Sequence, residues 1–134
     1  MIGLVVVTHG RLAEEFTLAV EHVVGRQKQM LAICIDADDD LSDRSLEIKK
    51  AAEEVNSGDG VILLTDMFGG TPSNLALKLL SKGQIEVLAG VNLPMLIKLA
   101  EARTTMSLDE ACQTAVDAGR KYMAIASEVL GKHK

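Results

Sequence analysis

Aromatic side chains and positive charge are scarce in this sequence. Phe16, Phe68 and Tyr122 are its only aromatic residues, and 14 lysines and arginines stand against 19 aspartates and glutamates, which gives a net charge of −5. Proteins that bind nucleic acid use basic patches and aromatic stacking platforms. The composition therefore argues against a nucleic-acid partner.

Cysteine and long apolar runs are scarce as well. Cys34 and Cys112 lack the close spacing of a zinc or redox site, and a chain of 134 residues buries enough surface to fold without disulfides or metals. We therefore expect reduced, packed thiols in a cytoplasmic protein. No apolar run approaches the roughly 18 residues of a membrane span, and the first run, residues 2–7, has no basic leader. The sequence predicts neither membrane insertion nor export.

Short β-branched runs alternate with longer amphipathic segments along the chain. The runs cover residues 2–7, 30–35, 60–64 and 85–89. This alternation is typical of βαβ units around a buried parallel sheet. Because there is no internal repeat and no Pro/Gly-rich linker, the sequence predicts one α/β domain over residues 1–134, with no linker and no second domain.

Apolar residues recur at helical spacing between and after these runs. They predict inward helix faces made of Leu12, Phe16, Ala19 and Val23, then of Leu41, Ile48, Ala52 and Val55, then of Leu75 and Leu79, and last of Leu108, Cys112, Ala115 and Val116.

Residues that begin and end helices refine these boundaries. Thr71 before a proline predicts a hydroxyl N-cap, and Asn92 begins a shorter helix with a proline in its first turn. Ser107–Glu110 forms a capping box, and Gly119 is expected to end the helix that follows. Periodicity leaves residues 121–127 open between a continued helix and an edge strand.

The expected sheet places two polar segments together. Four parallel strands with right-handed crossovers favour the doubly wound order 2-1-3-4, with helices on both faces. Strands 1 and 3 are then neighbours, and ligands bind in the crevice above their carboxyl ends. Strand 1 ends at His9, and strand 3 is followed by Asp66 and a loop with Gly69, Gly70 and Thr71. A histidine, a carboxylate and a glycine-rich loop are therefore predicted to converge.

These groups fit phosphoryl transfer. A neutral imidazole is a nucleophile when one nitrogen is free, and a carboxylate bonded to the other N–H fixes the tautomer. His9 would attack and Asp66 would orient it. Backbone N–H groups of Gly69, Gly70 and Thr71, at the start of a helix, would bind the phosphoryl oxygens.

A response-regulator receiver domain is an alternative with the same topology. In a receiver an aspartate at the end of strand 3 is phosphorylated, and Asp66 occupies that place. A receiver also needs an acidic magnesium-binding pair at the end of strand 1, where this sequence has Thr8 and His9. The residues therefore favour His9 over Asp66 as the phosphorylated residue.

The remaining polar residues have simpler interpretations. His22, within the first helix, and His133, near the end of the sequence, are expected to be solvated. The aspartates at 36, 38, 39 and 40 lack the spacing of an EF-hand and are expected to form a solvated loop that caps the second helix. We predict no metal site.

Three segments resemble mannose-type EIIA proteins of the bacterial phosphoenolpyruvate-dependent sugar phosphotransferase system. They are VVVTHG at 5–10, LLTDMFGGTPSNLA at 63–76 and AGVNLPML at 89–96. Their order and spacing are similar to those of the family, and the resemblance covers essentially the whole chain.

The resemblance implies roles for the residues of the crevice. It implies that His9 is phosphorylated, that Asp66 bonds to its ring and that the loop 69–71 receives the phosphoryl group. Phe68 stands where some members carry tryptophan, and it is expected to form an apolar wall beside the histidine that contacts partners.

The resemblance also implies the partners. Members accept a phosphoryl group from the phosphocarrier HPr and pass it to a IIB domain, with no cofactor bound. In many members the IIB domain follows on the same chain after a linker, whereas this sequence stops at Lys134, so we expect a phosphotransferase that serves a separate IIB protein. The alternative is a regulatory module whose His9 phosphorylation state is read by a binding partner. Family members form homodimers that exchange a C-terminal strand, which favours a strand at residues 121–127.

Overall fold

Four parallel strands form the central layer of the structure: β1 (Gly3–His9), β2 (Met30–Ile35), β3 (Val61–Thr65) and β4 (Ile85–Ala89). The computed structural model describes residues 1–131. The strand order is β2-β1-β3-β4, as predicted, and each neighbouring pair is parallel. β1 and β3 therefore lie side by side in the centre, with their carboxyl ends at the same edge of the sheet.

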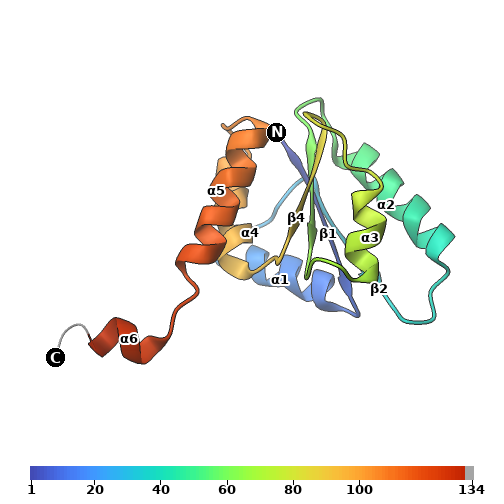
Figure 1. Cartoon of the computed structure of the whole chain (residues 1–134). Coiled ribbons are helices and arrows are strands. Elements are labelled where there is room, and N and C mark those ends of the chain that lie inside the picture. Colours follow the sequence, from blue (N-terminus) through green and yellow to red (C-terminus); the bar gives the residue numbers. More distant parts are fainter. Residues whose placement is uncertain (132–134) are drawn as a thin grey trace.

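Helices cover both faces of this sheet (Figure 1). α1 (Leu12–Val24), α4 (Leu93–Ala102) and α5 (Leu108–Lys121) cover one face, and α2 (Leu41–Val55) and α3 (Thr71–Leu77) cover the other. A further short helix, α6 (Ala126–Gly131), lies at the C-terminal end. The arrangement is the doubly wound α/β fold that the sequence predicted.

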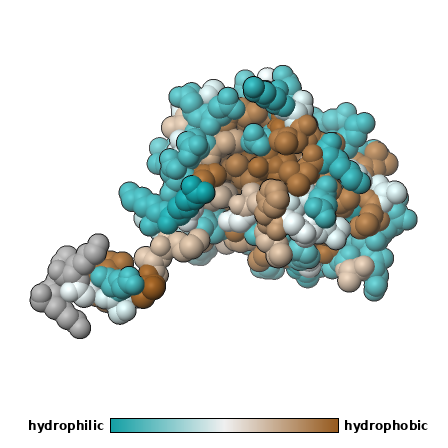
Figure 2. Space-filling model, in the orientation of Figure 1, coloured by the Kyte–Doolittle hydropathy of each residue, from teal (hydrophilic) through white to brown (hydrophobic). Residues whose placement is uncertain are grey.

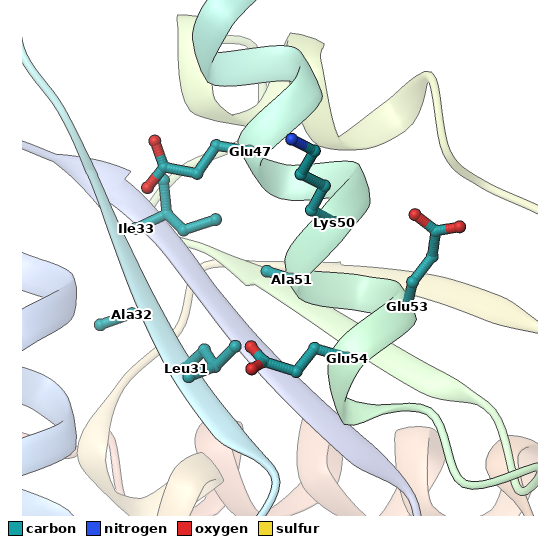
Figure 3. A pocket seen from close by; sticks show the side chains of 8 residues that line it. All are labelled: Leu31, Ala32, Ile33, Glu47, Lys50, Ala51, Glu53 and Glu54. Atoms are coloured by element: carbon teal, nitrogen blue, oxygen red, sulfur yellow. The ribbon is translucent and has the colours of Figure 1, made fainter.

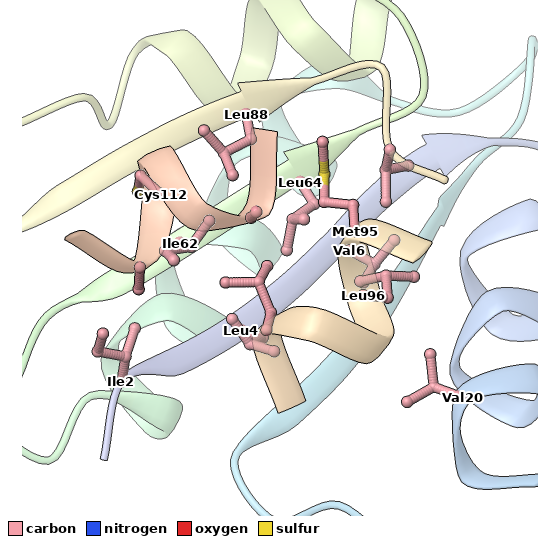
Figure 4. Packing of buried hydrophobic residues seen from close by; sticks show 14 of the residues in the cluster. Ile2, Leu4, Val6, Val20, Ile62, Leu64, Leu88, Met95, Leu96 and Cys112 are labelled. Atoms are coloured by element: carbon pink, nitrogen blue, oxygen red, sulfur yellow. The ribbon is translucent and has the colours of Figure 1, made fainter. Parts of the chain in front are cut away.

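The strands feed two separate cores. Successive side chains of a strand point to opposite faces, so Leu4 and Val6 of β1 join the core under α1, α4 and α5, while Val5 joins the core under α2 and α3. Figure 4 shows the first core, where β1 and β3 side chains meet Leu96 of α4 and Cys112 of α5. β1 and β3 are buried on both faces, which explains why they read as continuous apolar runs.

Both cysteines are free thiols in this fold. Burial raises the pKa of the Cys112 thiol to about 12, with a further contribution from the negative charges of Glu86 and Asp109. The thiol of Cys112 is therefore protonated and unreactive at neutral pH. Among residues 1–131, no helix is long and apolar enough to cross a bilayer.

The inward face of α1 differs from the prediction. Ala13 and Val20 are buried and Phe16 is partly buried, whereas Leu12 and Val23 are exposed. Apolar residues lie on more than one side of this helix. The spacing therefore fits either of two inward faces, one that begins at Leu12 and one that begins a residue later, at Ala13. The small side chain of Ala13 lets the helix approach the sheet closely, and this packing selects the observed face.

The helix caps were predicted with one error near the crevice. Asn92 caps α4 by accepting from the Met95 N–H, and the Ser107–Glu110 capping box is present. Thr71 is not an N-cap, because α3 begins at Thr71 and Gly70 is the capping residue, with no side-chain hydrogen bond.

Gly119 does not end α5, which continues to Lys121. It lies inside the helix, where a β-carbon would come within 3.3 Å of the Asn92 side-chain oxygen. The amide nitrogen of Asn92 donates to the Gly119 carbonyl at 3.0 Å. This glycine is therefore a close-packing position between α4 and α5 rather than a helix stop.

The strand expected at residues 121–127 is wrong for the single chain. Residues 122–125 are irregular and lead into α6, and Figure 1 shows this C-terminal arm (residues 122–131) leaving the domain. A strand needs a neighbouring strand for its hydrogen bonds. Here the arm makes local bonds instead, from the Glu128 and Val129 N–H groups to the Ile125 carbonyl. His133 lies outside the described residues.

Candidate active site

His9 and Asp66 are in direct contact at the carboxyl ends of β1 and β3. His9 is the last residue of β1, and Asp66 directly follows β3. The Nδ1 atom of His9 lies 2.8 Å from Oδ2 of Asp66, and the backbone N–H of His9 donates to the same oxygen at 3.0 Å. The other carboxylate oxygen accepts the Met67 N–H at 3.1 Å. The structure thus brings together the histidine and the carboxylate that the sequence selected.

Asp66 is held in its ionised form. Burial acts to raise the pKa of this carboxyl, but the hydrogen bonds from the His9 backbone and ring and the attraction of the ring outweigh it, so the pKa lies below its ordinary value. The Asp66 side chain is 14% exposed, whereas that of His9 is 50% exposed. The pair therefore combines a sheltered anion with an accessible ring.

The carboxylate fixes the tautomer of the neutral ring. An ionised carboxylate only accepts hydrogen bonds, so Nδ1 carries the proton and Nε2 carries the lone pair. The free nitrogen consequently lies on the far side of the ring from Asp66, in a side chain that is half exposed.

Gly70 closes one side of the ring. A β-carbon at this position would lie 2.7 Å from Cε1 and 3.1 Å from Nε2 of His9. Only glycine allows this approach without movement of the ring. Gly70 is also the N-cap of α3, so the first backbone N–H groups of that helix lack intrahelical acceptors.

The other residues of the loop combine an unusual backbone conformation at Gly69 with exposed side chains at Phe68 and Thr71. Gly69 has a φ of +97°, a conformation that side chains rarely adopt, and Thr71 is exposed. Phe68 exposes 73% of its surface. It is therefore available to a partner instead of being packed into the domain.

A cavity beside His9 includes residues that the sequence analysis did not place at the site. It has a volume of about 320 Å³ and is lined by His9, Gly10, Ile35, Asp36, Ala37, Leu41 and Thr71. Ile35 lies opposite His9 in the parallel register of β1 and β2. The predicted order 2-1-3-4 already made the end of β2 a neighbour of the crevice, and this signal could have found Asp36.

The remaining polar candidates lie as expected or apart from the site. His22 is exposed on α1. Asp40 caps α2 by accepting from the Ser42 and Asp43 N–H groups, and Asp39 accepts from the Asp36 N–H. The part of the chain that the structure describes holds no cluster of three or more potential metal-ligating side chains.

The fold and the site together define a small doubly wound domain with a histidine–aspartate pair at its switch point. Residues 3–116 match the EIIA-man family, described as the PTS system fructose IIA component. The match spans most of the sequence. The chain belongs to this mannose-type EIIA family of the sugar phosphotransferase system, and the receiver alternative is thereby rejected.

Individual relatives agree with this assignment. The chain is 32% identical over 90% of its length to the mannose-specific EIIAB component of the phosphotransferase system of Escherichia coli K12, but it spans only 38% of that protein. It is 24% identical to the fructose-specific EIIA component of Bacillus subtilis, with 100% of this chain and 92% of that protein covered. Among solved structures, the mannose/sorbose-specific IIA subunit of Enterococcus faecalis is similar with a TM-score of 0.82 and 27% identity, over 92% of this chain and 93% of that one.

Proposed function

We propose that His9 carries a phosphoryl group in transit between two proteins of the phosphotransferase system. The observation that carries this proposal is the 2.8 Å contact between Nδ1 and Asp66, because it leaves Nε2 unprotonated, on the far side of the ring from Asp66 and beside Gly70. Membership of the EIIA family supports the same role.

In this mechanism the Nε2 lone pair attacks the phosphorus of a phosphohistidine on the donor. The new N–P bond forms as the donor N–P bond breaks, and the electron pair of the broken bond stays on the donor imidazole. His9 keeps its Nδ1 proton, so the ring gains positive character, which the Asp66 carboxylate stabilises. Transfer to the acceptor is the same step in reverse.

The loop before α3 would bind the transferred group. Gly69, Gly70 and Thr71 would direct backbone N–H groups at the phosphoryl oxygens, because the N-terminal end of α3 offers unpaired donors. The absence of a side chain at Gly70 leaves room for the phosphoryl group next to the ring.

The proposed partners are the phosphocarrier HPr as donor and a separate IIB protein as acceptor. An apolar rim around the crevice would receive them, since Leu12, Met67 and Phe68 are exposed. Aromatic and methionine side chains are enriched at protein interfaces.

We further propose that two copies associate through the C-terminal arm. Its large apolar side chains, Tyr122, Met123, Ile125, Val129 and Leu130, are exposed, and apolar residues also gather on the domain surface between α5 and α3 (Figure 2). Burial of both surfaces in a homodimer would remove them from water.

Incubation with phosphoenolpyruvate, enzyme I and HPr, followed by mapping of the label, tests the transfer role. We expect acid-labile, base-stable label on His9 and its discharge on addition of a IIB protein. Label that persists in a His9→Ala variant would refute the assignment of the residue. Label on His9 that no IIB protein removes would favour the regulatory alternative.

A further inference from the structure

Within residues 1–131, the outer edge of β2 has no neighbouring strand, and β2 pairs with β1 alone. The Ile35 carbonyl accepts the Gly10 N–H, which directs the backbone groups of Ile35 toward β1. In a parallel ladder alternate residues bond to the same neighbour, so Met30, Ala32 and Cys34 present their N–H and C=O groups outward.

β4, at the opposite edge of the sheet, is partly closed by local contacts. Ile85 exchanges backbone hydrogen bonds with Ser81 at 3.0 and 2.8 Å, and the Glu86 carboxylate accepts the Val87 N–H at 2.9 Å. β2 has the sequence MLAICI, without the lysine, proline or charge that usually protects an edge. β2 is therefore the more receptive of the two edges.

A groove runs along this receptive edge. It has a volume of about 660 Å³ and lies between β2, at Leu31, Ala32 and Ile33, and α2, at Glu47, Lys50, Ala51, Glu53 and Glu54. In Figure 3 the side chains of Glu47 and Glu54 reach from α2 toward β2, whereas that of Glu53 is directed away. The groove thus has an apolar floor and an acidic wall.

The acidic wall selects the charge of an occupant. Glu47 forms an ion pair with Arg44 at 2.7 Å, whereas Glu54 makes no ion pair within residues 1–131. Lys50 also lines the groove, whose wall on α2 thus carries three glutamates and one lysine and remains acidic (Figure 3). A second copy of this chain would bring its own acidic wall against the first, so a basic segment of another protein is the complementary occupant.

We propose that the β2 edge binds an extended segment of a partner protein that carries lysine or arginine, as an added strand. The backbone of the segment bonds to Met30, Ala32 and Cys34, and its cations face Glu54 and Glu47. Main-chain bonds supply affinity in this mode, and alternate side chains supply specificity. The bound segment runs toward the crevice, because Ile35 and Asp36 at the end of β2 line the cavity beside His9.

The probe is an acetylated and amidated peptide, KVKTKVKTK, titrated into the full chain by calorimetry and by amide NMR. We expect micromolar affinity and slowed hydrogen exchange at the outward amides of Ala32 and Cys34. A peptide with glutamates in place of the lysines, and one N-methylated at alternate residues, are expected not to bind. These controls test the charge and the ladder without any change to the protein.

Glu54→Lys tests the acidic wall, with Glu53→Lys as its matched control. Both variants change the net charge equally and alter exposed residues of α2 that line the groove, but of the two side chains only that of Glu54 is directed toward β2 in Figure 3. We expect Glu54→Lys to weaken the peptide about tenfold and Glu53→Lys to weaken it less than about threefold. Three results would overturn the proposal: no binding at about 1 mM peptide, equal binding of the glutamate peptide, or amide changes confined to residues outside β2 and α2.

Discussion

One oxygen of Asp66 accepts both the backbone N–H and the ring Nδ1 of His9. The same atom therefore fixes where the chain of His9 lies and which way its ring faces. Both distances are short, at 3.0 and 2.8 Å, so the carboxylate holds the ring of the proposed nucleophile in place in the free protein.

Replacement of Asp66 by asparagine is expected to preserve the fold and slow phosphoryl transfer by roughly a hundredfold or more. The amide lacks the negative charge that stabilises the positive ring, and it can present an N–H to Nδ1. Rapid-quench measurement of transfer from phosphorylated HPr checks this. An unchanged rate would show that the carboxylate has only a structural role, and acid-stable label on Asp66 itself would contradict the histidine mechanism.

Asp66 should also make stability depend on pH in the acid range. Its pKa in the folded protein lies below the ordinary value of 3.8, so the unfolded chain binds the proton more tightly. The stabilisation by Asp66 is therefore complete above about pH 4 to 5 and is lost as the pH falls through the folded pKa. Urea unfolding of the protein and of Asp66→Asn from pH 6 to pH 3 should show a difference in unfolding free energy that shrinks with acidity. A difference that stays constant with pH would contradict this linkage.

Gly70→Ala is expected to disturb the ring with little effect on the fold. The added β-carbon meets His9 Cε1 at 2.7 Å, and the ring can move aside, so we expect a loss of unfolding free energy within about 1 kcal/mol. The displaced ring should lose its fixed tautomer, visible in imidazole ¹⁵N shifts, and accept phosphate more slowly. Gly131→Ala is the control, since no atom of residues 1–131 lies within 4 Å of a β-carbon there. Equal transfer rates in the two variants would remove Gly70 from the site.

Arg103 is expected to be important for stability and not for transfer. It is 2% exposed, and its guanidinium donates to the carbonyls of Ile2 and Gln29 at 3.2 and 3.0 Å, near the amino ends of β1 and β2. Arg103→Met leaves these buried acceptors unsatisfied and should cost roughly 3 kcal/mol or more of unfolding free energy. The folded fraction should still label His9, which lies at the other end of β1. A normal melting temperature would contradict this role.

Removal of the C-terminal arm, by truncation after Lys121, is expected to convert a dimer into a monomer. The arm carries Met123 and Ile125 as exposed apolar side chains, and their burial between copies is the proposed source of association. Light scattering at micromolar concentration measures both masses. A monomeric mass for the intact chain would refute the dimer.

The sequence predicted what depends on local pattern and on general topology. The bounds of β2 and β4 were correct to the residue, because each is a β-branched run bounded by polar or glycine residues. The contact between His9 and Asp66 followed from the strand order, since adjacent parallel strands end at the same edge of the sheet.

Features that depend on tertiary packing were not predictable in this way. Gly119 reads as a helix stop, but it serves the contact with Asn92 on another helix. The face of α1 was set by the fit of Ala13 against the sheet, which spacing does not encode. The groove beside β2 depends on where Glu54 of α2 lies relative to β2, and the sequence pattern does not give that position.

The double hydrogen bond from His9 to Asp66 also limits how the proposed phosphorylation of His9 could be signalled. A flip of the ring would place a carbon against the carboxylate and lose the Nδ1 bond, so the free and the phosphorylated histidine would share one ring orientation. The backbone of His9 is held by the same oxygen and stays in place as well. The two states would therefore share the positions of the ring and backbone and would differ by the phosphoryl group on Nε2, with its added volume and negative charge. A partner that distinguishes the phosphorylated protein from the unphosphorylated one would have to contact the crevice around His9 directly.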